Sequence, residues 1–304
     1  MRTTLHDEIL RTLGFAPHQI KQHGLTRFAT SSRPSNRDGW VRVMQDGIFR
    51  FGCWRQGVTG WWRDGAGNHQ SIKRDEHADK LALAAQEKQN QRNGRTNAQI
   101  FDCAHPLHRQ SPVGQYLVHR GLGALKHRPQ ALRMAVLPYF EDGVELGQYP
   151  VMLGAVTSSD GVLLGLHRTY ISSSGKKAPV PSPKKLSRTS GLLAGASIKL
   201  FEPTIISGKL TLGVAEGIET ALACYLASGI PTWSCVSASG IKSLQWPAGL
   251  QSLVIFGDND ASGAGQSAAR DLAGRAAAAG LECRVVIPET VGNDWLDDYV
   301  GGMA

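Results

Sequence analysis

The chain has 304 residues and a formal net charge of +8, with 33 Lys and Arg against 25 Asp and Glu. This length allows a sizeable core and about two domains. No apolar run approaches the roughly 18 residues of a membrane span, and the first residues lack the apolar core of a signal peptide. The five cysteines, at irregular spacings, make no disulfide framework, so we expect a reduced, cytoplasmic protein.

The charge is distributed unevenly along the chain. Residues 1–130 carry 20 basic and 10 acidic side chains, and residues 131–212 carry 9 and 5. Residues 213–304 carry only 4 basic side chains against 10 acidic ones. A basic body joined to an acidic C-terminal part suggests that one part holds a polyanion while the other holds cations. Nucleic acid is the polyanion that we expect; the alternative is that many of these basic side chains are simply solvated surface.

Residues 1–70 predict a small α+β module. An amphipathic helix is expected over 5–13, followed by short strands in WVRVM, GIFRFGCW and GWW that turn at Asp46-Gly47 and Gln56-Gly57. Arginines here alternate with aromatic residues, a pattern that can bind single-stranded nucleic acid by charge and stacking. The alternative is that the aromatic residues form the core of a small sheet. The contacts that we expect with single-stranded DNA are Arg42, Arg50, Trp54, Arg55 and Arg63.

Residues 71–130 are expected to be a helical connector. The stretch 74–100 is highly charged and free of Pro, which predicts an exposed helix that frays near Asn93-Gly94. A second helix is predicted over 111–121, with a serine cap and a glycine stop. Cys103-Ala104-His105 with His108 is a weak metal candidate, and these can equally be ordinary loop residues.

Residues 131–209 predict an α+β subdomain with a basic end. Strands are expected in ALRMAVLPYF, YPVMLGAVTS and GVLLGLHRTYIS, with a hairpin turn at Ser159-Asp160-Gly161 between the last two. The run 172–191 is basic and rich in Pro, which predicts a loop that stays mobile until a ligand arrives. A short strand at 195–200 and a linker near 203–209 follow.

Residues 210–304 alternate strand and helix. Strands are expected in LTLGVAEG, PTWSCVSAS, SLVIFGD and LECRVVIP. Helices are expected over 218–228 and 264–279, and a short last helix in GNDWLDDYV. This alternation predicts an α/β domain in which helices flank a parallel four-stranded sheet joined by right-handed crossovers.

Acidic residues follow three of these strands. They are Glu216 after the first strand, Asp258 and Asp260 after the third, and Asp294 after the fourth, with Asp297 and Asp298 close behind. Because parallel strands end at one edge of a sheet, we expect these carboxylates to lie together and to hold a divalent cation. Oxygen ligands without His or Cys favour Mg²⁺ or Mn²⁺, and such sites act on phosphates. The alternative is that the acidic residues cap helices.

A strand ending in Glu-Gly, a later strand ending in Asp-x-Asp and a further Asp together resemble the Toprim domain of primases, type IA and II topoisomerases, OLD nucleases and RecR proteins. GVAEGIETALA and IFGDNDASGAGQ are similar to the Toprim domains of plasmid and phage primases, including the P4 alpha type. Upstream, FGCWRQG, YLVHRGL and LHRTYISSSGKKAPVPSPKKLSRTSG resemble the same group. In FGCWRQG, Cys53 stands where that group usually has an acidic residue.

This resemblance implies an α/β fold with a C-terminal Toprim domain and an α+β primase region before it. It implies a DNA primase that makes short RNA primers on single-stranded DNA from nucleoside triphosphates. Glu216 would be the general base and a metal ligand, Asp258 and Asp260 the metal-binding pair, and Asp294, or in its place Asp297, the third acidic group. The expected nucleotide- and template-binding residues are Arg168, Lys184, Lys185, Arg188 and Lys199.

Two modules that often accompany primases have no counterpart in the sequence. There is no Cys-x₂-Cys pair for a zinc ribbon and no P-loop for a helicase. We therefore expect no zinc and a separate helicase partner. The other functions that the sequence leaves open are a metal-dependent Toprim nuclease and a non-catalytic single-strand-binding accessory protein of a mobile element.

Overall fold

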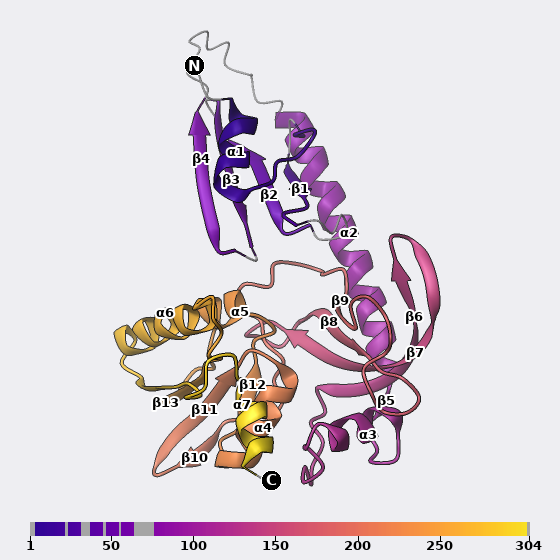
Figure 1. Cartoon of the computed structure of the whole chain (residues 1–304), viewed down its shortest axis with the longest axis vertical. Helices are drawn as coiled ribbons and strands as arrows, with labels where there is room; N and C mark the ends of the chain where they lie inside the picture. The colour runs from indigo at the N-terminus through magenta and orange to yellow at the C-terminus, as the bar shows by residue number, and fades with distance from the viewer. Residues whose placement is uncertain are drawn as a thin grey trace. The chain divides into compact units, whose positions relative to one another are not determined.

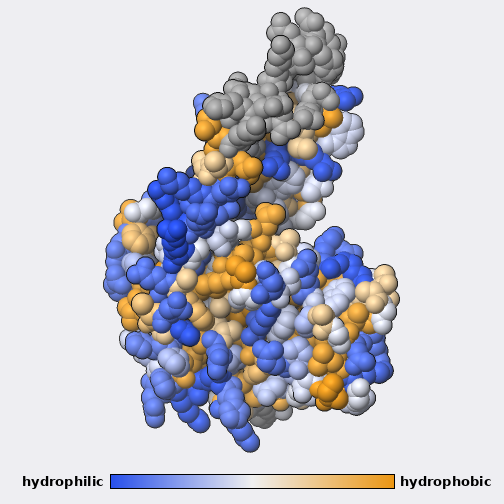
Figure 2. Space-filling model, turned by 180° about the vertical axis from the view of Figure 1, so that it is seen from behind, coloured by the Kyte–Doolittle hydropathy of each residue, from blue (hydrophilic) through white to orange (hydrophobic). Residues whose placement is uncertain are grey.

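The computed structural model describes residues 4–21, 24–31, 37–44, 47–54, 56–63 and 76–302. The chain divides into two compact units, Met1–Lys80 and Leu81–Ala304 (Figure 1). Boundaries at residues 70, 130 and 209 stay predictions. Among the described residues, no helix is both long and apolar enough to cross a membrane. The face shown in Figure 2 is largely hydrophilic, with hydrophobic residues in smaller patches.

The first unit is one helix and an antiparallel sheet. Its elements are α1 Leu5–Leu13, β1 Leu25–Phe28, β2 Gly39–Val43, β3 Ile48–Cys53 and β4 Val58–Arg63, with the strands in chain order. The helix begins at a capping box, because the Thr4 side chain accepts from the Asp7 backbone N–H and Asp7 accepts from that of Thr4. It ends where Gly14 adopts φ 75°. Strand β1 has no counterpart among the predicted elements.

Alternation along these strands gives the sheet one buried and one exposed face. Phe28, Val41 and Phe51 are buried and form a core with Ile9 and Leu13 of α1. The opposite face carries arginine and tryptophan side chains and is described with the candidate site.

The second unit contains a mostly antiparallel layer and a mostly parallel layer. The first layer consists of α2 Glu76–Asp102, β5 His105–Pro106, α3 Pro112–His119, β6 Leu132–Glu141, β7 Val144–Thr157, β8 Leu163–Tyr170 and β9 Lys184–Leu186. The start of α2, up to Lys80, belongs to the first unit. Its five strands pair in chain order, all antiparallel. Strands β6 and β7 form a long, curved hairpin (Figure 1). The predicted turn at Ser159-Asp160-Gly161 joins β7 to β8, and the serine cap at Ser111 is confirmed.

The basic run 172–191 is a loop over most of its length, as the sequence predicts, but it also contains a short strand. Within it, β9 pairs antiparallel with β8. Just beyond β9, the buried Ser187 Oγ accepts a hydrogen bond from the Leu166 backbone N–H at 2.8 Å. This pairing supplies hydrogen-bond partners for backbone groups of a polar segment. Composition alone cannot reveal such pairing.

The helix α2 runs without a break through Asn93-Gly94, so the expected fraying is wrong. Asn93 Nδ2 donates to the Thr189 carbonyl at 2.8 Å, and Asn97 Nδ2 donates to the Arg188 carbonyl at 2.9 Å. The two asparagines therefore hold the segment after β9, instead of weakening the helix.

The parallel layer confirms the predicted C-terminal architecture. It consists of β10 Thr204–Ile206, β11 Lys209–Ala215, α4 Ile218–Ser228, β12 Thr232–Ser234, α5 Ala238–Ser243, β13 Ser252–Phe256, α6 Ala264–Ala278, β14 Glu282–Val286 and α7 Trp295–Gly301. Strand β11 pairs in parallel with β12 and β13, and β13 with β14. The segment 203–209, expected to be a linker, instead forms an antiparallel hairpin of β10 with β11.

Helices cover both faces of this parallel sheet. Leu253 and Ile255 of β13 pack with Leu272 of α6 on one face, in a cluster that also includes α5. Phe256 packs with Leu222 of α4 on the other face, where α7 also contacts α4. Burial on both sides explains why β11 and β13 read as continuous apolar runs instead of alternating ones.

A short segment joins the two layers of the second unit. Ser197 exchanges backbone hydrogen bonds with Thr157 in β7, and Ile198 exchanges them with Ser234 in β12. The strand expected at 195–200 is thus reduced to single bridges. These bridges connect the end of β7, the middle strand of the antiparallel layer, to β12 of the parallel sheet.

Two glycines on helices are expected to respond to the same substitution with opposite signs. A Cβ at Gly114 of α3 would clash with the His108 carbonyl oxygen, whereas a Cβ at Gly274 of α6 would meet no described atom within 4 Å apart from the adjoining backbone of its own helix. We expect Gly114→Ala to lower the free energy of unfolding by about 2–3 kcal/mol. Gly274→Ala should raise it by about 0.5–1 kcal/mol. Urea unfolding followed by circular dichroism checks both, and equal effects would contradict the prediction.

Candidate active site

The carboxyl ends of β11 and β13 lie side by side at one edge of the parallel sheet. Ala215 and Phe256, the last residues of the two strands, are paired. The chain therefore brings out Glu216 and Asp258, one and two residues further on, at the same edge. With Asp294, which precedes α7, they line a cavity of about 210 Å³. The structure thus brings together three of the four predicted acidic residues.

The two strand-end carboxyl groups repel one another in a partly buried setting. Burial, followed by the charges of Asp258 and Asp260, raises the pKa of Glu216 to about 7, although Lys184 opposes this. Burial and the charges of Asp294 and Asp260 raise the pKa of Asp258 to about 6. Groups whose charge is disfavoured in this way are typical of functional sites.

Asp258 has an oxygen with no obvious role in the fold. Its Oδ1 is buried and has no hydrogen-bond partner among the described residues. Within that same part of the chain, no three His, Cys, Asp or Glu side chains converge as a ready metal cage. Mg²⁺ is commonly held by only one or two carboxylates together with waters and substrate phosphates. Glu216 and Asp258 fit that kind of site.

Asp294 is the N-cap of α7, as the alternative interpretation anticipated, and Asp260 accepts hydrogen bonds from backbone N–H groups just before and at the start of α6. Asp260 Oδ1 accepts from the Ser262 backbone N–H at 2.9 Å, and its Oδ2 accepts from that of Gly265 at 2.8 Å. These bonds outweigh burial and lower the pKa of Asp260. Asp294 Oδ1 accepts from the Leu296 backbone N–H at 2.8 Å at the start of α7. These hydrogen bonds fix where both carboxylates point, and Asp294 still lines the cavity.

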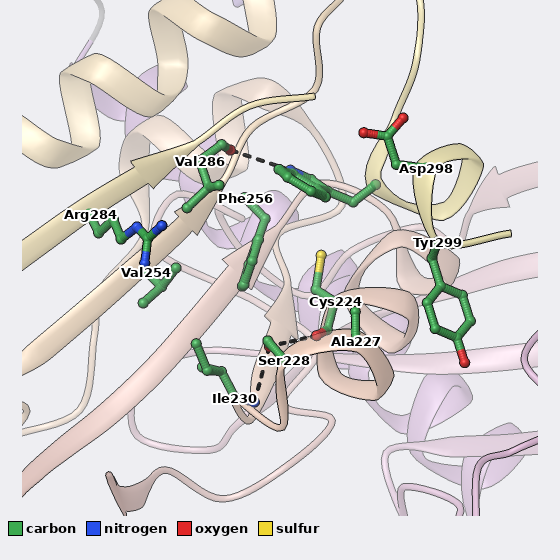
Figure 3. Close-up of a pocket in the computed structure, with 11 residues that line it drawn as sticks. Cys224, Ala227, Ser228, Ile230, Val254, Phe256, Arg284, Val286, Asp298 and Tyr299 are labelled. Atoms are coloured by element: carbon green, nitrogen blue, oxygen red, sulfur yellow. Dashed lines mark hydrogen bonds between the residues drawn. The ribbon is translucent and has the colours of Figure 1, made fainter. Parts of the chain in front are cut away.

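The two acidic residues after Asp294 lie elsewhere. Asp297 Oδ2 accepts from the Asp294 backbone N–H at 3.2 Å and completes the capping box. Asp298 accepts from Asn293 Nδ2 and lines a separate, apolar cavity of about 350 Å³. Figure 3 shows that cavity, with Cys224 and Phe256 on its walls. Of Asp294, Asp297 and Asp298, it is therefore Asp294 that lines the cavity together with Asp258.

Of the predicted basic residues, the structure brings only Lys184 to the acidic cavity. Lys184 pairs with Thr169 across β9 and β8, and the next pair is Lys185 with Arg168. Successive pairs point to opposite faces of a sheet, so Lys185 and Arg168 lie on the other face. There Lys185 Nζ donates to Glu141 Oε2 at 2.7 Å.

The remaining two basic residues do not line the cavity either. The side chain of Arg188 is exposed just after β9. Lys199 Nζ donates to the Ser159 carbonyl at 3.0 Å and lies 5.4 Å from the centre of the Trp233 ring. A nucleotide- or template-binding role for Arg168, Lys185, Arg188 and Lys199 stays a prediction.

Sequence reasoning missed a buried group that holds Lys184. Glu219, in the first turn of α4, is 3% exposed and accepts from Lys184 Nζ at 3.0 Å and from the Tyr116 hydroxyl at 2.7 Å. Burial alone would raise the pKa of Glu219, but Lys184 and these hydrogen bonds lower it to about 2. The signal was present in IETALA, where an acidic residue interrupts a helix that is otherwise almost wholly apolar.

Two further features of the cavity concern its backbone. Gly217 is the N-cap of α4, and no side chain of a described residue caps that end, so the helix begins open at the cavity. The free N–H groups of a helix N-terminus favour anions. Val236, also in the lining, has φ 69°, a left-handed conformation that β-branched residues rarely adopt. Strained backbone of this kind is often found at functional sites.

The exposed face of the first unit carries the other predicted contacts, and we call it the Arg/Trp face. Arg42 of β2 lies directly opposite Arg50 of β3, which lies opposite Trp61 of β4. Trp61 is 68% exposed, and Arg63 is exposed on the same side. Like charges placed directly opposite each other destabilise a sheet. A polyanion bound here would offset that repulsion.

A second row of the Arg/Trp face adds aromatic rings. The centres of the Trp40 and Trp54 rings are 5.8 Å apart, and the Arg27 guanidinium lies 4.8 Å from the Trp54 ring. The view that the aromatic residues only form a core holds for Phe49, Phe51 and Trp62, on the opposite face. Arg55, also predicted as a contact, lies outside the described residues.

Comparison with known proteins bears on both layers of the second unit. The model of the Toprim domain matches residues 211–302, and that of a domain of unknown function, DUF7146, matches residues 91–199. No curated protein sequence matches the chain.

Among solved structures, a DNA primase domain from Pseudomonas aeruginosa is 15% identical over 53% of this chain and 50% of its own, with a TM-score of 0.36. The chain thus spans half the length of that relative. The E. coli primase catalytic core is 16% identical over 67% of this chain and 73% of its own, with a TM-score of 0.40. The primase fragment of the bacteriophage T7 primase-helicase protein is 12% identical over 91% and 95%, with a TM-score of 0.39. The parallel sheet, the strand-end carboxylates and the family match agree that residues 211–302 are a Toprim domain.

Proposed function

We propose that the chain is a DNA primase, an enzyme that synthesises short RNA primers on single-stranded DNA by metal-dependent nucleotidyl transfer. The observation that carries this proposal is a Toprim domain whose Glu216 and Asp258 share one cavity with Lys184. Carboxylates that can hold a cation, together with a lysine that can bind phosphate in the same cavity, suit a nucleotidyl-transfer reaction. The sequence motifs favour a role in the replication of a plasmid, a phage or another mobile element. The proposed enzyme would act in the cytoplasm together with a separate helicase.

Glu216 and Asp258 would hold Mg²⁺ or Mn²⁺, which supplies charge neutralisation at the transferring phosphate when bound. Asp258 presents the unpartnered Oδ1 for this purpose. Glu216, with a pKa of about 7, is also suited to accept the proton of an attacking sugar hydroxyl at neutral pH.

Two positive groups face these carboxylates and would bind nucleotide phosphates. Lys184 reaches the cavity from β9, anchored through Glu219. The open N-terminus of α4 at Gly217 adds backbone N–H donors. Phosphates between these groups and a cation would be fixed from both sides.

A primer-synthesis assay tests the proposal. The full chain is incubated with single-stranded templates of defined sequence and four NTPs, in Mg²⁺ or Mn²⁺. We expect short RNA products from the wild type and none from Glu216→Gln. Asp271→Asn is the matched control, because Asp271 is an exposed carboxylate of the same domain that pairs with Lys242. No products from the wild type under either metal would refute the proposal, and plasmid nicking without NTPs would indicate a nuclease instead.

The Arg/Trp face is the part of the first unit that we expect to hold the template. Trp61→Ala should weaken binding of single-stranded DNA about tenfold, because an exposed ring can stack on a base. Arg50→Ala should weaken it and reduce its dependence on salt by about one phosphate contact. Arg11→Ala, on α1 behind the sheet, is the control and should change neither. Fluorescence anisotropy of a labelled oligonucleotide measures this, and unchanged affinity in both variants would contradict the prediction.

A further inference from the structure

His167 is a buried polar group of the acidic cavity that neither the cation site nor the phosphate contacts employ. It lies on β8 opposite Leu186 of β9, and its ring lines the cavity beside Lys184. The ring is half-buried, yet its Nδ1 atom is buried completely and has no hydrogen-bond partner in the part of the chain that the structure describes. Buried polar atoms are nearly always paired in native proteins. Because the ring of His167 lines a cavity, its unpaired nitrogen points to a ligand that binds there and reaches the ring.

The surroundings of His167 keep its ring uncharged. Burial and the positive charge of Lys184 outweigh the attraction of Glu219 and lower the pKa of His167 to about 4. A neutral imidazole has one nitrogen that donates and one that accepts. It therefore suits an uncharged partner with a hydroxyl or an N–H group better than it suits a phosphate.

If the proposed function is taken as the basis, the part of a nucleotide that His167 contacts can be found by elimination. The phosphates suit Lys184 and the N-terminus of α4. An enzyme that copies a template must accept all four bases, so a fixed side chain near the phosphates cannot select one base edge. The sugar hydroxyls are what all four NTPs share. We propose that His167 hydrogen-bonds to a hydroxyl of the ribose and so makes the site select ribonucleotides over nucleotides that lack this hydroxyl.

Direct binding of nucleotides tests this inference without relying on catalysis. Isothermal titration of the full chain, with Mg²⁺ and no template, gives the affinities of ATP, dATP and 3′-deoxy-ATP. We expect the wild type to bind ATP at least about tenfold more tightly than one of the two deoxy analogues, because that analogue cannot make the hydrogen bond to the His167 ring. The weaker analogue identifies which hydroxyl His167 contacts.

Two substitutions separate recognition from structure. His167→Ala should lower the affinity for ATP about tenfold and leave the affinity for the weaker-binding analogue nearly unchanged. The variant should therefore no longer discriminate between the two nucleotides. His167→Asn, which keeps a donor and an acceptor near the same place, should retain part of the discrimination and serves as the test if the Ala variant does not fold. His105→Ala, at an exposed histidine of β5, is the control and should discriminate as the wild type does.

The outcomes separate this inference from the proposed function. If the wild type binds none of the three nucleotides, the proposed function itself is wrong. If it binds them and either His167 variant weakens all three equally, or if discrimination survives in both variants, His167 does not contact the sugar and the inference is overturned.

Discussion

Asp258→Asn is expected to abolish primer synthesis and, at the same time, to make the metal-free protein more stable. The loss should be on the order of 10³-fold, because the substitution removes a charged ligand where a metal contributes several kcal/mol to the transition state. The gain arises because the Asp258 carboxylate is held beside Asp294 and Asp260 in a partly buried place. Asn keeps the shape without the charge.

The size and pH dependence of the gain follow from the pKa of Asp258. This pKa is about 6 in the folded protein against 3.8 for the ordinary group, so the folded state binds this proton more tightly. The contribution to stability is therefore fully present below about pH 4 and is lost as the pH rises through 6. Discounted for partial exposure, the Asn variant should be about 1–2 kcal/mol more stable than wild type at pH 8. The difference should vanish near pH 4.

Only the difference between the two proteins isolates Asp258. Glu216 shifts stability in the same direction between about pH 4.5 and 7, whereas His167, with its lowered pKa, loses stability as the pH falls through 6.5 toward 4. The effect of His167 is present in both proteins and cancels in the comparison. The part of the Glu216 pKa shift that the charge of Asp258 causes is lost in the variant and adds to the difference in the same direction. Urea unfolding at pH 8, 6 and 4 measures the difference in the free energy of unfolding between Asp258→Asn and the wild type, with Asp271→Asn as the control. A variant less stable than wild type at pH 8 would show that Asp258 supports the fold instead of a cation.

The parallel domain could be predicted from the sequence because its signals are local. The strands β11 and β13 are continuous apolar runs, and α4 and α6 each begin next to a glycine. The carboxyl ends of parallel strands must share an edge, so Glu216 and Asp258 could be placed together from their positions in the chain. That placement depends only on neighbours in sequence and one topological rule.

The basic side of the site could not be predicted to the same degree, because it depends on the face of a strand. The sequence KK within 172–191 offers two lysines of equal charge, but pairing of β9 with β8 sends Lys184 to the cavity and Lys185 to the other face. A register is a long-range property that charge composition does not contain. The same holds for His167, which is a candidate only because its Nδ1 is buried and unpaired in the folded chain.

Glu219→Ala is expected to cost about 2–3 kcal/mol of stability and also to weaken nucleotide binding. The substitution leaves the hydroxyl of Tyr116, a 2% exposed side chain, without its acceptor and opens a small cavity. Lys184 is 41% exposed and can turn to water, so its loss of a partner adds less. Without Glu219, Lys184 Nζ has no hydrogen-bond partner among the described residues to hold it near the carboxylates. If the proposed function is right, the KM for NTPs should rise about tenfold while Glu216 and Asp258 stay in place.

Three comparisons make this prediction specific to the buried pair. Tyr116→Phe, which removes only the hydroxyl, should cost about 1 kcal/mol. Glu282→Ala, which breaks the exposed Lys209–Glu282 ion pair, should cost at most about 0.5 kcal/mol. Lys184→Ala should raise the KM as Glu219→Ala does, and the double variant should be no worse than either, because both remove one positioned ammonium group.

Acidification gives an independent check on the same carboxylate. The pKa of Glu219 is lowered to about 2 in the folded protein from an ordinary 4.5, so its contribution is present above about pH 4.5 and is lost as the pH falls toward 2. The stability difference between wild type and Glu219→Ala should therefore shrink below pH 4.5. Acid thus lowers the stability of the wild type relative to Glu219→Ala, whereas it raises the stability of the wild type relative to Asp258→Asn. If the Glu219 difference stays constant down to pH 3, or the KM is unchanged, Glu219 fills space in α4 and does not hold Lys184 at the site.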